Sequence, residues 1–214
     1  MKLFSLIIIA IVLNVSFAKG SPSFVANPVD TVLEKAKKLH VLYLRATTVK
    51  QPDVKTKFYE RQFFTEFPNN FKLFNTLYGT TKGKPGYLNE VAEKHLDLFN
   101  GLTNIVDSVY YKKLIILASE GVWDIDAVSY LQNGLKTRFL RNPDLVMSIL
   151  KKMPPKKIRN FWYFFFDCLY PERDIPDYVK KVTIENEAIF KLMVDAHAAV
   201  VKARESDDNP IGEK

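Results

Sequence analysis

The sequence is poor in residues that form covalent cross-links. Its 214 residues include one cysteine, Cys168, so no internal disulfide is possible and the fold must be stabilised by packing. Cys168 stands in an aromatic segment, between Asp167 and Leu169. We therefore expect it to be a small buried hydrophobic residue and not a reactive thiol.

The sequence also lacks the histidine patterns of metal sites. It has three histidines, His40, His95 and His197, and none has a second histidine four residues away. None follows a glutamate by three residues, as a helical di-iron site requires. His95 and His197 stand at or beside apolar stripes, which favours structural, hydrogen-bonded roles. We predict no metal and no cofactor.

Motifs for covalent catalysis are missing as well, because no G-x-S-x-G sequence occurs. The remaining candidates for chemistry are three carboxylates in the segment SEGVWDID: Glu120, Asp124 and Asp126. A carboxylate pair is what glycoside hydrolysis requires, and Trp123 beside them could stack on a sugar. A cell-wall glycan hydrolase is therefore one alternative. Helix capping by Asp124 and packing by Trp123 explain the same residues without catalysis.

The N-terminus has the three parts of a secretory signal peptide. Lys2 supplies a positive charge, an apolar run covers residues 3–15, and SFA at residues 16–18 is a small-x-small cleavage site. A membrane anchor is the alternative, but a spanning helix needs about 20 apolar residues and this run is shorter. We expect cleavage after Ala18, with no stable membrane insertion afterwards. The remaining 196 residues would carry a net charge of +6 in the periplasm or the medium.

Apolar residues at spacings of three and four recur through the rest of the chain, with few period-two stretches. This pattern predicts an all-α fold, an irregular bundle of about eight helices in a single domain over residues 19–204. Residues 205–214 are mostly polar and should form a flexible tail. The glycine-rich residues 79–86 should be a mobile surface loop.

Local signals mark several helix boundaries. Asn27-Pro28 and Asn142-Pro143 combine a capping residue with a proline that fits the first helical position. Asp124 should cap a further helix in the same way. One continuous helix is expected from about residue 177 toward residue 202.

The run FWYFFF at residues 161–166 is aromatic on every side of a helix, which is typical of an element buried all round. A strand is the alternative, since periodicity cannot decide so short a run. The helical spacing of Ile158 and Leu169 favours a helix. We predict that this segment is the central helix of the core.

The segment KKMPPKKIR carries five positive charges and no negative one: Lys151, Lys152, Lys156, Lys157 and Arg159. Its two prolines would place these cations in a turn between two helices. A solvated turn is the interpretation that we favour, and a binding surface for an acidic protein or for phospholipid headgroups is the alternative. Nucleic acid is not expected, because export is predicted and no recognisable binding module is present.

The run FFTEFPNNFKLFNTLYG, residues 63–79, resembles a stretch in uncharacterised exported helical proteins of bacteria. Some of those proteins act as immunity partners of interbacterial toxins. The similarity covers 17 of 214 residues, consists of aromatic spacing and includes no catalytic residue. It implies an exported, non-enzymatic binding protein that neutralises a toxin by stoichiometric binding. An envelope-associated structural protein is a further alternative.

Overall fold

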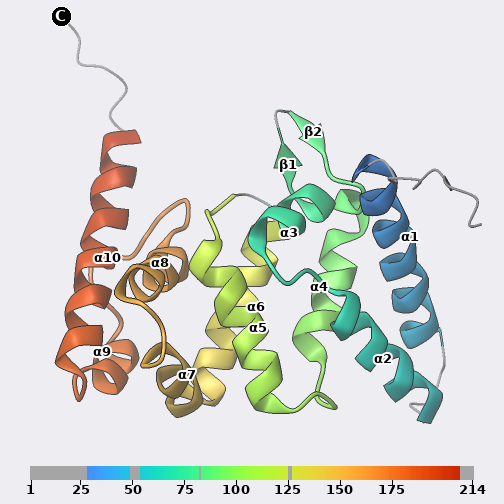
Figure 1. Cartoon of the computed structure of the whole chain (residues 1–214). Coiled ribbons are helices and arrows are strands. Elements are labelled where there is room, and N and C mark those ends of the chain that lie inside the picture. Colours follow the sequence, from blue (N-terminus) through green and yellow to red (C-terminus); the bar gives the residue numbers. More distant parts are fainter. Residues whose placement is uncertain (1–27, 49–53, 82, 125–126, 208–214) are drawn as a thin grey trace, which may run out of the picture.

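A computed structural model describes residues 28–48, 54–81, 83–124 and 127–207. These residues form ten α-helices, one short 3₁₀ helix and one small antiparallel hairpin, which confirms the all-α prediction (Figure 1). None of these helices combines the length and the apolar character needed to cross a membrane. The predicted signal peptide, residues 1–18, lies outside the described residues.

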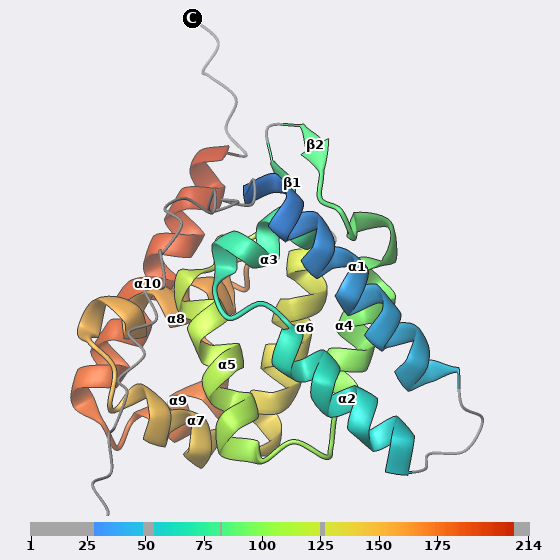
Figure 2. The ribbon, with the colours of Figure 1, turned by 45° about the vertical axis from the view of Figure 1, so that its right-hand side comes forward.

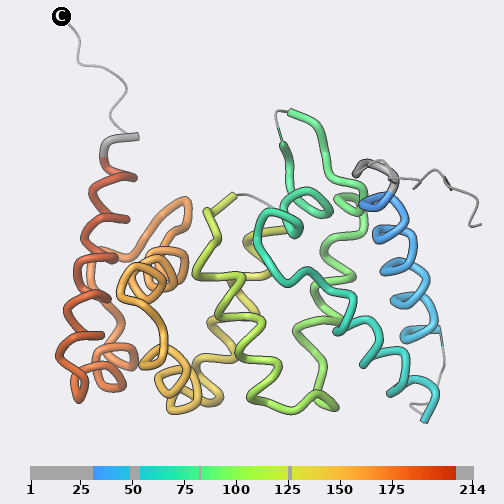
Figure 3. Tube along the Cα trace, viewed as in Figure 1, coloured from blue at the N-terminus to red at the C-terminus, as the bar shows by residue number. Residues whose placement is uncertain are grey.

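The helices in chain order are α1 (Pro28–Thr47), α2 (Val54–Glu66), α3 (Phe71–Tyr78), α4 (Ala92–Gly101), α5 (Asp107–Glu120), α6 (Ala127–Arg141), α7 (Pro143–Leu150), α8 (Pro155–Phe166), α9 (Asp177–Thr183) and α10 (Glu187–Asp207). The 3₁₀ helix is η1 (Asn89–Val91), and the strands are β1 (Thr80–Thr81) and β2 (Lys84–Pro85). The colours of Figure 3 show that the helices follow one another across the molecule roughly in chain order. In Figures 1 and 2, α1 and α2 form one edge and α10 lies at the other.

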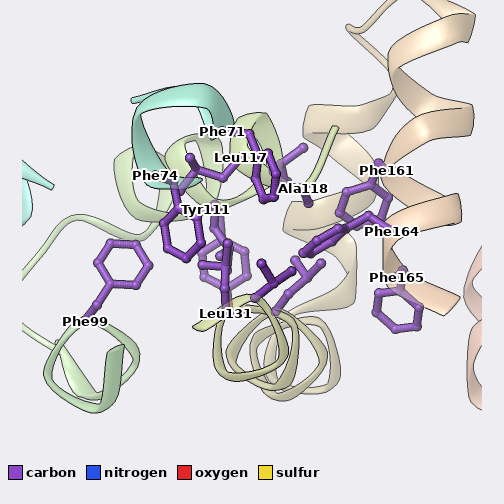
Figure 4. Close-up of a cluster of buried hydrophobic side chains, with 14 of the residues drawn as sticks. Phe71, Phe74, Phe99, Tyr111, Leu117, Ala118, Leu131, Phe161, Phe164 and Phe165 are labelled. Atoms are coloured by element: carbon purple, nitrogen blue, oxygen red, sulfur yellow. The ribbon is translucent and has the colours of Figure 1, made fainter. Parts of the chain in front are cut away.

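The core runs through the middle of this arrangement and is largely aromatic. Helix α8 packs against α5 on one side and α10 on the other. Its residues Phe161, Trp162, Phe164 and Phe165 are almost completely buried, as predicted for the central core helix. Figure 4 shows the buried side chains continuing from the three labelled phenylalanine rings of α8, past α5 and α6, to Phe99 of α4.

Asparagine side chains begin several of the helices. Asn142 accepts a hydrogen bond from the backbone N–H of Leu145 at 3.2 Å, which confirms the predicted start of α7. Asn70 caps α3 in the same way. The cap predicted at Asp124 stays a prediction, because residues 125 and 126, between Asp124 and the first described residue of α6, lie outside the described part of the chain.

The predicted last helix is divided into two. Helix α9 ends at Thr183, and α10 begins after Asn186, whose side chain accepts a hydrogen bond from Ile189 N at 3.0 Å. A capping residue therefore interrupts an apolar pattern that looked continuous. Helix α10 runs to Asp207, so the first three residues of the expected tail are helical. Residues 208–214 lie outside the described part.

Residues 79–86, which we predicted to be a loop, contain the hairpin. Thr80 pairs with Pro85 and Thr81 with Lys84. Gly83 has a φ of 75°, a backbone conformation that glycine adopts without steric cost. A Cβ atom on Gly86 would lie 2.5 Å from the carbonyl oxygen of Leu77, so this close approach requires glycine. The hairpin is thereby held against the end of α3.

Candidate functional site

The basic segment lies partly in a turn and partly in a helix. Two of its cations are in the turn after α7 and three are in the first turns of α8, namely Lys151 and Lys152, then Lys156, Lys157 and Arg159. The prediction that the proline pair places all five in a turn is therefore wrong. Pro155 is the first residue of α8, a position where its missing N–H is not needed. All of these side chains are exposed except Lys157, which is half-buried.

The positive charges at the start of α8 oppose the helix dipole. The free N–H groups of a helix N-terminus favour acidic side chains, yet the first turn of α8 has none and carries Lys156 and Lys157. An unfavourable charge at an exposed helix end costs about 0.3 to 1 kcal/mol. These lysines therefore do not contribute to fold stability through the helix dipole.

Glu120, at the end of α5, neutralises one of these lysines. Its carboxylate accepts hydrogen bonds from Lys157 Nζ at 2.8 Å and from Phe71 N at 3.3 Å. The hydrogen bond from Lys157 is the main cause that lowers the pKa of Glu120. A general acid of glycoside hydrolysis needs a raised pKa, so Glu120 is suited only to the part of base or nucleophile. Asp124 lies in the exposed loop after α5, and Asp126 is outside the described residues.

An apolar groove of about 830 Å³ lies beside the basic turn. Its lining comes from α5, α7, the basic turn and the connection between α2 and α3: Asn69, Ser108, Val109, Lys112, Lys113, Ile116, Ile149, Lys152 and Met153. This volume is within the range of about 300 to 1,000 Å³ that is usual for ligand clefts. All three charged residues in this lining are lysines.

Lys113 is the half-buried lysine of the groove, and it supplies a hydrogen-bond donor that Pro68 lacks. In a continuing helix, the carbonyl oxygen of Phe64 would accept a hydrogen bond from the N–H of residue 68, but Pro68 has no N–H. Lys113 Nζ replaces it, donating to Phe64 O at 2.6 Å and to Phe67 O at 2.8 Å. The ammonium also lies 4.5 Å from the centroid of the Phe64 ring. A cation at the C-terminal end of α2 is favoured by the helix dipole.

Within the described residues, this ammonium makes no ion pair with a carboxylate. The negative charge of Glu66 raises the pKa of Lys113. The Glu66 carboxylate itself accepts hydrogen bonds from Lys35 and Lys38. Burial has the larger effect and, with the charge of Lys35, lowers the pKa of Lys113 to about 8. An ammonium can donate three hydrogen bonds, and the carbonyls take two of them.

Of the three groove lysines, Lys152 was predicted from the sequence as a candidate binding residue, and Lys112 and Lys113 were not. The two α5 lysines lie about 40 residues earlier in the chain, and only the packing of α5 against α7 brings them to the same surface. A sequence signal existed for Lys113, because Pro68 leaves a helix carbonyl without its partner. Nothing in the sequence indicated which cation would supply the hydrogen bond.

The remaining candidate residues lie elsewhere. His197 Nε2 is 2.9 Å from the carbonyl oxygen of Glu172, which fits the predicted structural role. Cys168 is only partly buried, contrary to our expectation, and lines a pocket of about 140 Å³ together with His197. Among the residues that the structure describes, no group of three or more His, Cys, Asp or Glu side chains is placed to hold a metal ion.

Comparisons of this chain with protein-family models, with curated proteins and with solved structures found no match.

Proposed function

We propose that this chain is an exported, non-enzymatic binding protein that holds an acidic segment of a partner protein in the groove between α5 and α7. Binding is stoichiometric, and the specific function that we propose for it is neutralisation of a toxin. The observation that carries this proposal is Lys113, a half-buried ammonium with no carboxylate partner in the described residues, beside a groove whose other charges are also lysines.

The chemistry of the groove favours an amphipathic acidic segment. Burying a charge is unfavourable unless it is paired, so a carboxylate that accepts the third hydrogen bond of Lys113 would be stabilised there. Val109, Ile116 and Ile149 would contact the apolar face of the same segment. An amphipathic helix that lays its apolar face in a groove is a recurrent mode of peptide recognition. The exposed Lys112 and Lys152 would attract the partner and accelerate association.

Export and toxin neutralisation rest on the sequence. The charge, apolar run and small residues of positions 2–18 support a signal peptide and a periplasmic or secreted location. The aromatic run at 63–79 supports the resemblance to immunity proteins. Its rings Phe63, Phe67 and Phe74 are fully buried, so this similarity concerns the core and not a binding surface.

The test uses the purified protein as bait in an extract of envelope and secreted proteins, followed by calorimetry with each captured protein. We expect an acidic partner with a stoichiometry of one to one. The double charge reversal Lys112→Glu with Lys152→Glu should slow association strongly, and added salt should weaken the wild-type complex. Lys94→Glu with Lys181→Glu reverses two exposed lysines outside the groove, is the control matched in charge, and should leave affinity unchanged.

Two results would contradict the proposal. A complex that is indifferent both to the double reversal and to salt would show that the groove is not the binding surface. Turnover of peptidoglycan that is lost in Glu120→Gln would show that the chain is a hydrolase, because this substitution removes a carboxylate and leaves the three groove lysines in place.

A further inference from the structure

A series of hydrogen bonds leads from the core toward the surface at the edge of the molecule formed by α1 and α2, where α1 contacts α4. His95 of α4 is 0% exposed. Its Nδ1 lies 3.1 Å from Tyr78 Oη, and its Nε2 lies 3.2 Å from Nδ1 of the half-buried His40 on α1. Tyr43 of α1 packs against the His95 ring, with centroids 4.6 Å apart. The three polar side chains are therefore held in fixed positions.

The number of hydrogens on these side chains fixes the direction in which the hydrogen bonds run. The hydroxyl of Tyr78 is buried, and His95 Nδ1 is its hydrogen-bond partner among the described residues. A buried hydroxyl hydrogen needs an acceptor, so Tyr78 donates to Nδ1 and His95 carries its proton on Nε2. Nε2–H then donates to Nδ1 of His40, and His40 in turn carries its proton on its own Nε2. Burial favours the neutral form of His95, whose pKa is lowered to about 4.

His40 is also part of a pocket of about 330 Å³, outside the lysine-lined groove. The other lining residues come from β2, η1 and the residues between them: Pro85, Gly86, Tyr87, Leu88, Glu90 and Val91. His40 Nε2 has no hydrogen-bond partner in the described part of the chain, and no ion pair there includes Glu90. The pocket lining therefore includes one imidazole and one carboxylate residue, His40 and Glu90, among mainly apolar residues.

We propose that this pocket binds one ring of a neutral sugar. A sugar hydroxyl both donates and accepts hydrogen bonds, so adjacent hydroxyls can accept from His40 Nε2–H and donate to Glu90. Tyr87 is 47% exposed and offers an aromatic surface to the apolar face of the ring. The carboxylate of Glu90 would repel an acidic ligand. The volume lies at the lower end of about 300 to 1,000 Å³ for ligand sites, which suits a single ring.

The experiment adds glucose, galactose, mannose or N-acetylglucosamine to the full-length protein and follows saturation-transfer NMR of the sugar. Glucuronate, which carries a carboxylate, is the charged counterpart. We expect millimolar binding of at least one neutral sugar and weaker binding of glucuronate. Failure of all four neutral sugars to bind, or tighter binding of glucuronate, would overturn the proposal.

Two variants test the residues that hold the ring. Tyr87→Ala and Glu90→Gln should each weaken binding of the neutral sugar by about tenfold, the effect of losing one good contact. Tyr170→Ala removes a more exposed tyrosine outside this pocket and is the matched control. Equal affinity of all four proteins would overturn the proposal.

The direction of the hydrogen-bond chain has its own readout. Nitrogen-15 NMR of the imidazoles at neutral pH should show the proton on Nε2 of both His40 and His95. A proton on Nδ1 of His40 would remove the donor from the pocket and contradict the assignment. This measurement and the sugar titration do not depend on the groove, so they remain decisive whether or not the proposed acidic partner exists.

Discussion

Lowering the pH should destabilise the protein through His95. The side chain is fully buried, and burial, with a smaller contribution from His40, lowers its pKa from 6.5 to about 4. Because the unfolded chain binds the proton more readily, this contribution to stability is complete above pH 6.5 and is lost as the pH falls toward 4. Linkage with these two pKa values gives a loss of about 2.5 kcal/mol between pH 7.5 and pH 4.5.

Urea denaturation at a series of pH values measures this loss. His95→Gln is the comparison variant, because glutamine retains hydrogen-bonding groups and does not titrate. The variant should be less stable at pH 7.5, where the wild-type contacts are intact, but it should lack the histidine part of the pH dependence. Carboxylates such as Glu66 and Glu120, whose pKa values are lowered, titrate in both proteins and cancel in the difference. If the two proteins lose the same free energy of unfolding between these pH values, burial of His95 does not lower its pKa as described.

Three further results are expected. Phe165→Ala should lower the free energy of unfolding by about 3 to 5 kcal/mol in urea, because the ring is 1% exposed, and a loss below about 1 kcal/mol would contradict its place in the core. Mass spectrometry of the protein from its native host should find a chain that starts at or near Lys19, whereas an intact Met1 on a membrane-bound species would contradict the predicted signal peptide. Binding of the acidic partner should weaken as the pH rises above about 8, where Lys113 loses its proton, and Lys113→Gln should lose this dependence. An unchanged pH profile in that variant would show that the Lys113 charge takes no part in binding.

The helical class and the central helix could be predicted because both depend on local pattern. Apolar spacing determines which face of a helix is buried, and the aromatic run at 161–166 leaves no polar face. The asparagine and proline at positions 142 and 143 act within one helical turn, so their effect was equally predictable. The division between α9 and α10 had the same kind of signal in Asn186, but the apolar spacing on both sides of it concealed the break.

The groove and the histidine pocket could not be predicted, because each combines residues from distant parts of the chain. Lys113 and Lys152 become neighbours of one cavity only when α5 and α7 pack together. His40 and His95 are 55 positions apart, and neither shows a pattern that indicates the other. The wrong prediction for the basic segment had a local cause. The proline pair after α7 suggested a turn, but Pro155 also fits the first position of the next helix.

The hydrogen bonds from Lys113 to the end of α2 make two distant positions depend on each other in evolution. While residue 68 is proline, the carbonyl oxygen of Phe64 needs a donor from outside the helix, and a lysine at position 113 supplies it. Any other residue at position 68 would supply a backbone N–H for the carbonyl oxygen of Phe64, and Lys113 would then be needed only for the carbonyl oxygen of Phe67. In related chains, we therefore expect a lysine at position 113 to be kept more strictly where residue 68 is proline.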